Sequence, residues 1–543
     1  MIRGADILAR ALDRAGLTNI FTLSGNHIMP IFDAAIGTRL NLIHVRHEGA
    51  AVHMADAWGR LSGMPGLALV TAGPGHANAI GALATAQAAE SPLILLSGHA
   101  AIGEIGRGAF QEMQQAATAA PLCKAAWVAA SAEGLGHDIA HAVSIARSGR
   151  PGPVHVSLPF DVLEMKVEEG ARLWPAEADF EPSRTVLPGD RADAILAALE
   201  EAERPLILAG AAMADIGGRA LLRSVAVSTR VPAVLMESPR GIKDPSLGAL
   251  AEMLRQADLL VLLGKPHDFT LRFAEPPFVD PGCRFIAVDP DGAMLDRVRG
   301  EKGARLMLST IAEPHAAARV LSEMAHRSDR RLDWFHQVGT ALAYRPPEWD
   351  APRPRDAKVH PIDFCRAIQP LLAGDEEAVF VCDGGEIGQW AQALLEAPRR
   401  LINGVAGSIG SAIPFALTAR LFEPRAPVIA VMGDGTFGFH MAEFDTAVRR
   451  DLPFVAVIGN DATWNAEYQI QLRSYGEARA HGCDLLPSRY DKVVEALGGH
   501  GEFVERVDDL APALHRALAS GKPACVNVMI ERVGAPVIRR ESA

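Results

Sequence analysis

The 543-residue sequence has no long uninterrupted apolar run and no recognisable secretory leader. A membrane-spanning helix needs about 18 or more consecutive apolar residues. Runs such as LILLSG and LLVLLG are far shorter, and we interpret them as buried strands. The amino terminus, MIRGADILARALDRAGLTNIF, has apolar residues at helical spacing with acidic residues among them, unlike a secretory signal. We therefore expect no membrane partner.

Cysteine and positive charge are also scarce. The six cysteines are scattered without a C-x-x-C pair, which predicts neither a disulfide framework nor a zinc site and favours a reducing, cytoplasmic setting. The formal net charge is -12 at pH 7, whereas nucleic acids and anionic membranes select basic surfaces. We expect no nucleic-acid partner, and an anionic ligand must be held by local groups.

The composition is that of an α/β enzyme, with 49% hydrophobic and 22% charged residues. Short apolar segments such as GLALV, PLILAG and PVIAVM alternate with helical patterns, which predicts parallel sheets covered by helices on both faces. Two polar, proline-bearing stretches, EEGARLWPAEADFEPSRTVLPGD and AYRPPEWDAPRPRDAKVHP, interrupt the alternation. We therefore predict three doubly wound parallel-sheet domains over residues 1–168, 186–340 and 356–543.

The strongest local motif is PVIAVMGDGTFGFHMAEFDTAVRRDLPFVAVIGNDATW. It predicts a buried strand, a tight turn at GDG, one amphipathic helix over HMAEFDTAVRR, and a second buried strand. Asp434 and Asn460 would then lie at the carboxyl ends of neighbouring parallel strands, where open α/β sheets bind their ligands.

Two ligands fit this motif. Gly433, Gly435 and Gly438 match G-x-G-x-x-G, the dinucleotide fingerprint, but Asp434 would place a carboxylate against a bare pyrophosphate. A divalent cation removes this conflict. Magnesium prefers oxygen ligands and usually bridges them to phosphates. Asp434, the Asn460 amide oxygen and the Ala462 carbonyl are its candidate ligands.

GDG followed by an asparagine turn 26 residues later resembles the signature of thiamine-diphosphate (ThDP) enzymes. The family usually has two asparagines, whereas this chain has Gly459 and Asn460 and keeps the second, ligand-bearing position. The order of three α/β domains resembles that of the acetolactate synthase family over essentially the whole chain. The resemblance implies pyrimidine-binding, central and diphosphate-binding domains, with ThDP and Mg²⁺ as cofactors.

The first domain carries a second match to this family, RHEGAAVHMADAWGRLSG at residues 46–63. It implies that Glu48 is the catalytic glutamate beside the aminopyrimidine ring. An apolar pocket that keeps such a carboxyl partly protonated favours proton transfer to the ring. The resemblance also implies that Glu48 meets the cofactor of another subunit, so we expect at least a homodimer and favour a homotetramer.

Other positions are assigned to the cofactor site on the same resemblance. Gly407 would accept a hydrogen bond from the aminopyrimidine, and Ile409 would wedge under the bent cofactor. Gly385 and Glu386 fall where the diphosphate is approached, although Glu386 is an unexpected charge near an anion. The remaining cofactor candidates are Gly433, Gly435, Thr436 and Trp464.

Within the family, the first domain is most similar to benzaldehyde lyase and the 2-hydroxyacyl-CoA lyases. LSGNHIMPIFDAA places His27, and GAFQEMQQ places Gln111, where side chains reach the substrate. The resemblance implies a lyase or carboligase that acts on 2-hydroxy ketones or 2-hydroxyacyl-CoA, with a small carbonyl compound as substrate or product.

Three alternatives stay open. The first is acetolactate synthase-type condensation or decarboxylation of 2-keto acids, which RHEGAA and GNDATW make second choice. A dinucleotide-binding oxidoreductase is third, and a non-catalytic homologue is last because Glu48, Asp434 and Asn460 are all present. In the central domain, Asp289 is expected to end a strand in a turn, and no phosphate loop supports FAD. Arg539 and Arg540 could hold a CoA phosphate or be surface charges.

Overall fold

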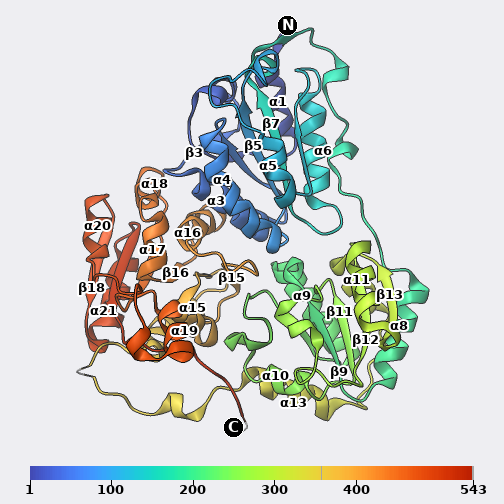
Figure 1. Cartoon of the computed structure of the whole chain (residues 1–543), viewed down its shortest axis with the longest axis vertical. Helices are drawn as coiled ribbons and strands as arrows, with labels where there is room; N and C mark the ends of the chain where they lie inside the picture. Colours follow the sequence, from blue (N-terminus) through green and yellow to red (C-terminus); the bar gives the residue numbers. More distant parts are fainter. Residues whose placement is uncertain (356, 541–543) are drawn as a thin grey trace.

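The computed structural model of the chain describes residues 1–355 and 357–540, which form three α/β domains (Figure 1). Each domain contains one parallel sheet of five or six strands. This arrangement confirms the fold class expected from the alternation of strands and helices. Residues 356 and 543, the predicted ends of the third domain, lie outside the described residues.

The first domain has a six-stranded parallel sheet in the order β3-β2-β4-β5-β7-β6. Its strands are β2 (Asn19–Thr22), β3 (Asn41–His44), β4 (Gly66–Val70), β5 (Leu93–His99), β6 (Ala125–Val128) and β7 (Pro153–Pro159). Its helices are α1 (Gly4–Arg14), α2 (Met29–Ala34), α3 (Glu48–Ser62), α4 (Pro74–Ala88), α5 (Gln115–Ala119), α6 (Leu135–Arg147) and α7 (Phe160–Glu164). A short antiparallel pair, β1 (Ile2–Arg3) with β8 (Lys166–Val167), joins the beginning of the domain to its end.

The central domain has a five-stranded parallel sheet in the order β10-β9-β11-β12-β13. Its strands are β9 (Pro205–Ala209), β10 (Ala233–Leu235), β11 (Leu259–Leu263), β12 (Arg284–Asp289) and β13 (Leu306–Ile311). Its helices are α8 (Gly189–Glu201), α9 (Ile216–Thr229), α10 (Leu250–Leu254), α11 (Gly292–Lys302), α12 (Pro314–Met324) and α13 (Leu332–Ala343). Apolar clusters lie on both faces of this sheet.

The third domain repeats the six-stranded pattern in the order β15-β14-β16-β17-β19-β18. Its strands are β14 (Val379–Cys382), β15 (Arg399–Ile402), β16 (Val428–Gly433), β17 (Val455–Asn460), β18 (His500–Val504) and β19 (Ala524–Met529). Its helices are α14 (Pro361–Ala373), α15 (Gly385–Leu394), α16 (Ala412–Phe422), α17 (Asp434–His440), α18 (Glu443–Arg449), α19 (Asn465–Tyr475), α20 (Tyr490–Ala496) and α21 (Val507–Ala519).

The first and third domains share one apolar core. Helices α3 and α16 pack side by side in the middle of the molecule, and their buried residues belong to a single cluster with strands of both sheets (Figure 1). Alanines on both helices allow close approach, and Thr418 donates a hydrogen bond to the Met54 carbonyl across the contact (3.1 Å). Because no polar layer separates them, the two domains form one packed unit.

The GDG segment differs from the expected tight turn. Gly433 is the last residue of β16, and Asp434 is already the first residue of α17. The single helix expected over HMAEFDTAVRR is two short helices, α17 and α18, separated at Met441 and Ala442. An acidic residue in the first turn of a helix is favoured by the positive end of the helix dipole, which explains a helix that starts at Asp434.

Candidate functional site

Asp434 and Asn460 lie next to each other at one edge of the third sheet. Strands β16 and β17 are parallel, and Gly433 pairs with Gly459, so the residues that follow these glycines occupy equivalent positions. The expectation that they end neighbouring parallel strands is confirmed.

The carboxyl group of Asp434 lacks a full set of partners. The residue is 2% exposed, and its Oδ2 has no hydrogen-bond partner within the described residues. Burial raises the pKa of this carboxyl to about 6, although backbone N–H groups that include Gly435 and Ala462 oppose the shift. Burial, followed by repulsion from Asp434, raises the pKa of the neighbouring Asp461 to about 7. A buried carboxyl with a free oxygen beside a second acid is a place where a cation would be stabilised.

Asn460 and Ala462 form the turn that faces this carboxyl. The Asn460 Oδ1 accepts a hydrogen bond from the Ala462 N–H (3.1 Å), and its Nδ2 donates to Asn527 Oδ1 (3.1 Å) and the Ser488 carbonyl (3.2 Å). These bonds fix the amide so that its oxygen points into the turn. Ala462 has a φ of 56°, and its carbonyl accepts one hydrogen bond from Leu485 N–H (2.8 Å), which leaves one lone pair.

A narrow cavity of about 80 Å³ opens in front of these residues. Its wall includes Gly384, Gly385, Gly433, Gly435 and Gly459, together with Asp434, Thr436, Asp461 and Trp464. A Cβ atom on Gly435 would lie 2.6 Å from the Trp464 ring, and one on Gly459 would lie 2.6 Å from Ile387. The close approach of Ile387 therefore explains a glycine where the family usually has its first asparagine.

Helix α15 begins at this glycine-lined cavity without a side-chain cap. The preceding residue, Gly384, makes no capping hydrogen bond, and Gly385 has a φ of 83° with open space where a Cβ would stand. Backbone N–H groups at the start of a ten-residue helix can hold an anion, and the helix dipole favours one there. The cavity thus places an anion-binding helix start beside a carboxyl that lacks a cation.

Glu386 lies in the first turn of α15 and lines the same cavity. Its Oε2 accepts a hydrogen bond from Gln389 Nε2 (2.8 Å), and burial raises the pKa of its carboxyl. This reduces the conflict with an anion that the sequence raised. Thr436 is turned toward its own strand, where its hydroxyl donates to the Gly433 carbonyl (3.0 Å).

Gly407 and Ile409 belong to the loop between β15 and α16. Ile409 lines the glycine-lined cavity, and its Cγ2 lies 2.9 Å from the position of a Cβ on Gly384. Gly407 is exposed, has a φ of 68°, and donates its N–H to the Gly404 carbonyl (3.0 Å). Gly407 is not among the residues that line this cavity.

The three candidate residues of the first domain gather around the loop of residues 71–75, which follows β4. Glu48 begins α3, and its Oε1 lies 3.3 Å from the position of a Cβ on Gly75. His27 Nδ1 lies 3.4 Å from Thr71 Oγ1. The Gln111 carbonyl lies 2.5 Å from the position of a Cβ on Gly73, where only glycine fits. The structure therefore brings together residues from three separate segments.

Two further polar residues hold this cluster. Asn78 donates to Glu48 Oε2 (3.1 Å). Buried Gln115 accepts from Gly73 N–H (3.0 Å) and donates to the Gly98 carbonyl (3.0 Å), so it fixes the loop against β5. Sequence reasoning missed both residues because neither belongs to a local motif. Burial lowers the pKa of His27, so the imidazole is neutral at pH 7.

A larger cavity, of about 690 Å³, adjoins the glycine-lined one and shares Glu386 with it. We call it the tail cavity because the chain end, residues 535–539, forms one wall. Its basic side chains are Arg240, Lys243, Arg255, Arg272, Arg473 and Arg539, against Asp244, Glu252 and Glu386. Arg540 is bound to Glu252 (2.8 and 2.9 Å) and so anchors the chain end to the central domain.

Three other expectations can be compared with the structure. Asp289 accepts from the Asp291 N–H (2.9 Å) in a turn and also pairs with Arg150, in agreement with the turn interpretation. All six cysteines are free thiols, as their spacing predicted. Among the helices of the described part of the chain, none is long and apolar enough to cross a membrane.

Comparison with known proteins defines the class. Three family descriptions match the chain in order: thiamine pyrophosphate enzyme, N-terminal TPP binding domain, at residues 2–118; central domain, at residues 192–307; and C-terminal TPP binding domain, at residues 383–528. Thiamine pyrophosphate is ThDP. The chain therefore belongs to the thiamine pyrophosphate enzyme family, and it is a ThDP-dependent enzyme, as the GDG motif predicted.

Particular relatives come from two enzyme types. An acetolactate synthase large subunit of Mycobacterium tuberculosis is 32% identical over 97% of this chain and 95% of its own length. A 2-hydroxyacyl-CoA lyase 2 of Danio rerio is 30% identical over 97% of this chain and 91% of its own. A ThDP-dependent 4-hydroxybenzoylformate decarboxylase of Rhodococcus jostii has the same fold, with a TM-score of 0.83, 22% identity and coverage of 98% and 99%.

The residues at the third-sheet edge fit this cofactor. The free Oδ2 of Asp434 and the glycine-lined start of α15 supply a cation ligand and an anion cradle side by side. Within residues 1–355 and 357–540, no cluster of three or more His, Cys, Asp or Glu side chains is arranged to hold a metal ion. A site made from one carboxylate, one amide and one carbonyl is of the oxygen-ligand type that magnesium prefers.

Proposed function

We propose that this enzyme uses ThDP and Mg²⁺ to break or form the carbon–carbon bond beside a carbonyl in 2-hydroxy ketones or 2-hydroxyacyl-CoA thioesters. Family membership supports the ThDP chemistry. The observation that carries the metal assignment is the buried Asp434 carboxyl, whose Oδ2 has no partner within the described residues. A divalent ion that bridges this oxygen to a diphosphate would remove the electrostatic cost.

In this proposal, Asp434, Asn460 and the Ala462 carbonyl hold magnesium, and the start of α15 at Gly385 holds the diphosphate. When bound, ThDP supplies a carbon nucleophile and an electron sink for the bond that breaks or forms. The protein contributes binding, orientation and proton transfer. Ile409 and Trp464 are proposed to enclose the cofactor, because both line the glycine-lined cavity.

Glu48, His27 and Gln111 are proposed to act on the reacting atoms. The Glu48 carboxyl would hold a proton at the aminopyrimidine ring. His27, neutral and buried at 6% exposure, would accept or return the proton of the substrate hydroxyl, and Gln111 would bind its oxygen. The loop of residues 71–75 sets the relative positions of the three groups.

A second copy of the chain would complete the site. Every residue that lines the glycine-lined cavity comes from the third domain, whereas Glu48, His27 and Gln111 surround a loop of the first. We therefore propose a homodimer in which each cofactor lies between the third domain of one protomer and the first domain of its partner. A homotetramer would be a pair of such dimers.

This arrangement can be tested by mixing two inactive variants, Glu48→Gln and Asp434→Asn. With sites shared between protomers, co-expression should restore about a quarter of wild-type activity, because about half of the dimers are mixed and each has one intact site. Sites built within single protomers would give no restoration, and that result would overturn the shared site.

The tail cavity supports a substrate with an anionic handle. Six basic side chains line it, and it adjoins the proposed cofactor site through Glu386. Phosphate groups of a CoA thioester are the kind of charge that arginine binds best. This favours 2-hydroxyacyl-CoA over small keto acids.

Acetolactate synthase-type condensation, or decarboxylation of 2-keto acids, is the second candidate. It is supported by the 32% identity to the mycobacterial acetolactate synthase subunit. The two candidates differ in substrate size and charge, because a small keto acid does not need the basic tail cavity.

The deciding experiment assays the purified enzyme, loaded with ThDP and Mg²⁺, against a benzoin-type ketone, pyruvate and a 2-hydroxyacyl-CoA ester. We expect aldehyde release from the ketone or the thioester, abolished by dialysis against EDTA and restored by ThDP with Mg²⁺. Arg240→Gln should raise KM for the thioester and leave KM for the ketone unchanged. Turnover of pyruvate alone would favour the second candidate.

A further inference from the structure

A separate cavity of about 570 Å³ lies where all three domains meet. We call it the junction cavity. Its wall is formed by the end of α3, the segment before α9, the starts of α9 and α12, and strand β15. The residues that line the glycine-lined cavity do not contribute to it. Its volume is within the range of small-molecule sites, about 300–1,000 Å³.

The junction cavity is strongly basic in an acidic protein. Seven arginines and four carboxylates line it, whereas the whole chain carries a net charge of -12. Each carboxylate already has a cationic partner. Glu90 pairs with Arg150, and Glu313 pairs with Arg184 (2.9 Å). The other two are Glu237, described next, and Asp215, which lies 3.0 Å from His315.

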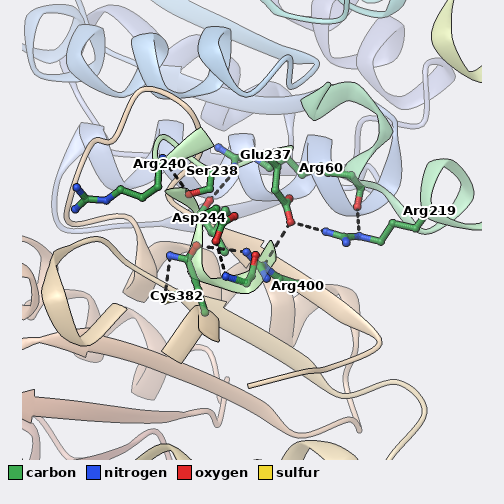
Figure 2. Close-up of polar contacts among 12 residues, drawn as sticks. Arg60, Arg219, Glu237, Ser238, Arg240, Asp244, Cys382 and Arg400 are labelled. Carbon is green, nitrogen blue, oxygen red and sulfur yellow. Dashed lines mark hydrogen bonds and ion pairs between the residues drawn. The ribbon is translucent and has the colours of Figure 1, made fainter. Parts of the chain in front are cut away.

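Glu237 gathers arginines from all three domains, and Figure 2 shows its carboxylate between Arg219 and Arg400. Its Oε1 lies 2.7 Å from Arg219 and 3.4 Å from Arg400. Burial opposes ionisation of Glu237, but the charges of Arg219, Arg400 and Arg60 outweigh it and lower its pKa. One carboxylate therefore faces three guanidinium groups, and the cluster keeps an excess of positive charge.

Two further arginines face the cavity without a carboxylate in hydrogen-bond contact. Arg147 ends α6, and Arg319 lies on α12; neither has a hydrogen bond or an ion pair in residues 1–355 and 357–540. Burial lowers the pKa of Arg147, an effect that the nearby charge of Arg184 increases. Uncompensated guanidinium groups around a cavity are the arrangement that binds phosphate.

We propose that the junction cavity binds a small molecule with two or more phosphate groups, of the size of a nucleoside diphosphate, and that this ligand joins the three domains. Phosphate oxygens would contact Arg147 and Arg319 and share Arg60, Arg219 and Arg400 with Glu237. Because these arginines belong to different domains, binding would favour one relative placement of the domains. The cavity would thus be a regulatory site, separate from the proposed cofactor site.

The test uses isothermal titration of ADP into the enzyme saturated with ThDP and Mg²⁺, with excess free Mg²⁺ and with adenosine as the uncharged comparison. We expect ADP to bind and adenosine not to bind. The double variant Arg147→Gln/Arg319→Gln should weaken ADP binding by about tenfold or more. Arg223→Gln/Arg297→Gln is the matched control, because it removes two exposed arginines that do not line the cavity and should leave the Kd within about twofold.

The outcomes separate clearly. Absence of ADP binding, or equal affinity in the wild-type protein and the Arg147/Arg319 variant, would overturn the proposal. Equal weakening in both double variants would also overturn it, because it would indicate only a general charge effect. Binding is measured without turnover, so this proposal can fail while the proposed lyase activity stands.

Discussion

Replacing Asp434 with asparagine should stabilise the magnesium-free protein, although it removes a side chain that the proposed function needs. Burial raises the pKa of this carboxyl from 3.8 to about 6, which corresponds to a cost of about 3 kcal/mol for the ionised form in the folded protein. Because the folded-state pKa is the higher one, this cost is absent below about pH 4 and fully present above about pH 6.

Asparagine removes the charge but keeps the shape. Its amide nitrogen would occupy the place of Oδ2, which has no partner within the described residues, and an unsatisfied amide costs about 1–2 kcal/mol. The expected net gain is therefore about 1–2 kcal/mol at pH 7. Addition of Mg²⁺ and ThDP should stabilise the wild-type protein and have little effect on the variant.

Asp491 offers a matched control in the same domain. It is 1% exposed, but Arg489 donates to its two oxygens (2.9 and 2.6 Å). Although burial opposes it, the hydrogen bond from Arg489 lowers the pKa of Asp491. Asp491→Asn should therefore destabilise the protein, by about 1–2 kcal/mol, while Asp434→Asn stabilises it.

Urea unfolding at about pH 7, with and without Mg²⁺ and ThDP, measures both effects. A lower unfolding midpoint for Asp434→Asn than for the cofactor-free wild-type protein would refute the account of an uncompensated buried charge. Equal stabilisation of both proteins by Mg²⁺ and ThDP would refute the assignment of Asp434 as a metal ligand.

Three more outcomes are expected. Glu48→Gln should lower kcat of the loaded enzyme by about 100-fold or more and leave the unfolding midpoint in place, because glutamine can still accept the bond from Asn78; an unchanged kcat would contradict its role. Gly435→Ala should weaken ThDP binding, because the added carbon would lie 2.6 Å from the Trp464 ring, whereas Gly438→Ala, with no atom within 4 Å, should not. Burial lowers the pKa of His76 to about 4, so the unfolded chain takes up a proton first as pH falls below about 6.5, and stability measured by urea unfolding should drop by about 2 kcal/mol between about pH 7 and pH 5. His76→Gln should reduce that drop, and an unreduced drop would exclude His76 as its source.

The strands that sequence patterns revealed and those that they missed differ in position. Continuous apolar runs predicted the inner strands, which are covered on both faces, as in β4 and β11. The three missed parallel strands, β6, β13 and β18, are each the edge strand of their sheet. Their residues are mostly half-buried, and polar residues interrupt the apolar pattern, so AAWV or HGEFV has no clear strand signal.

The candidate site was predictable where the backbone imposes a motif. Asp434 and Asn460 follow paired glycines at strand ends, so their spacing in the sequence determines their proximity in space. Asp461, Asn78 and Gln115 act through contacts between distant segments, and no local pattern distinguishes them from surface residues. The junction cavity was also invisible in the sequence, because its arginines come from three domains.

The joint interior of α3 and α16 has a consequence for synthesis of the chain on the ribosome. The apolar face of α3 is complete once residue 62 has emerged, but its partner α16 begins about 350 residues later. At about 5–20 residues per second, this face waits roughly 20–70 seconds for its counterpart. During that interval the nascent first domain presents an adhesive surface, so chaperone capture should concentrate on it until the third domain appears.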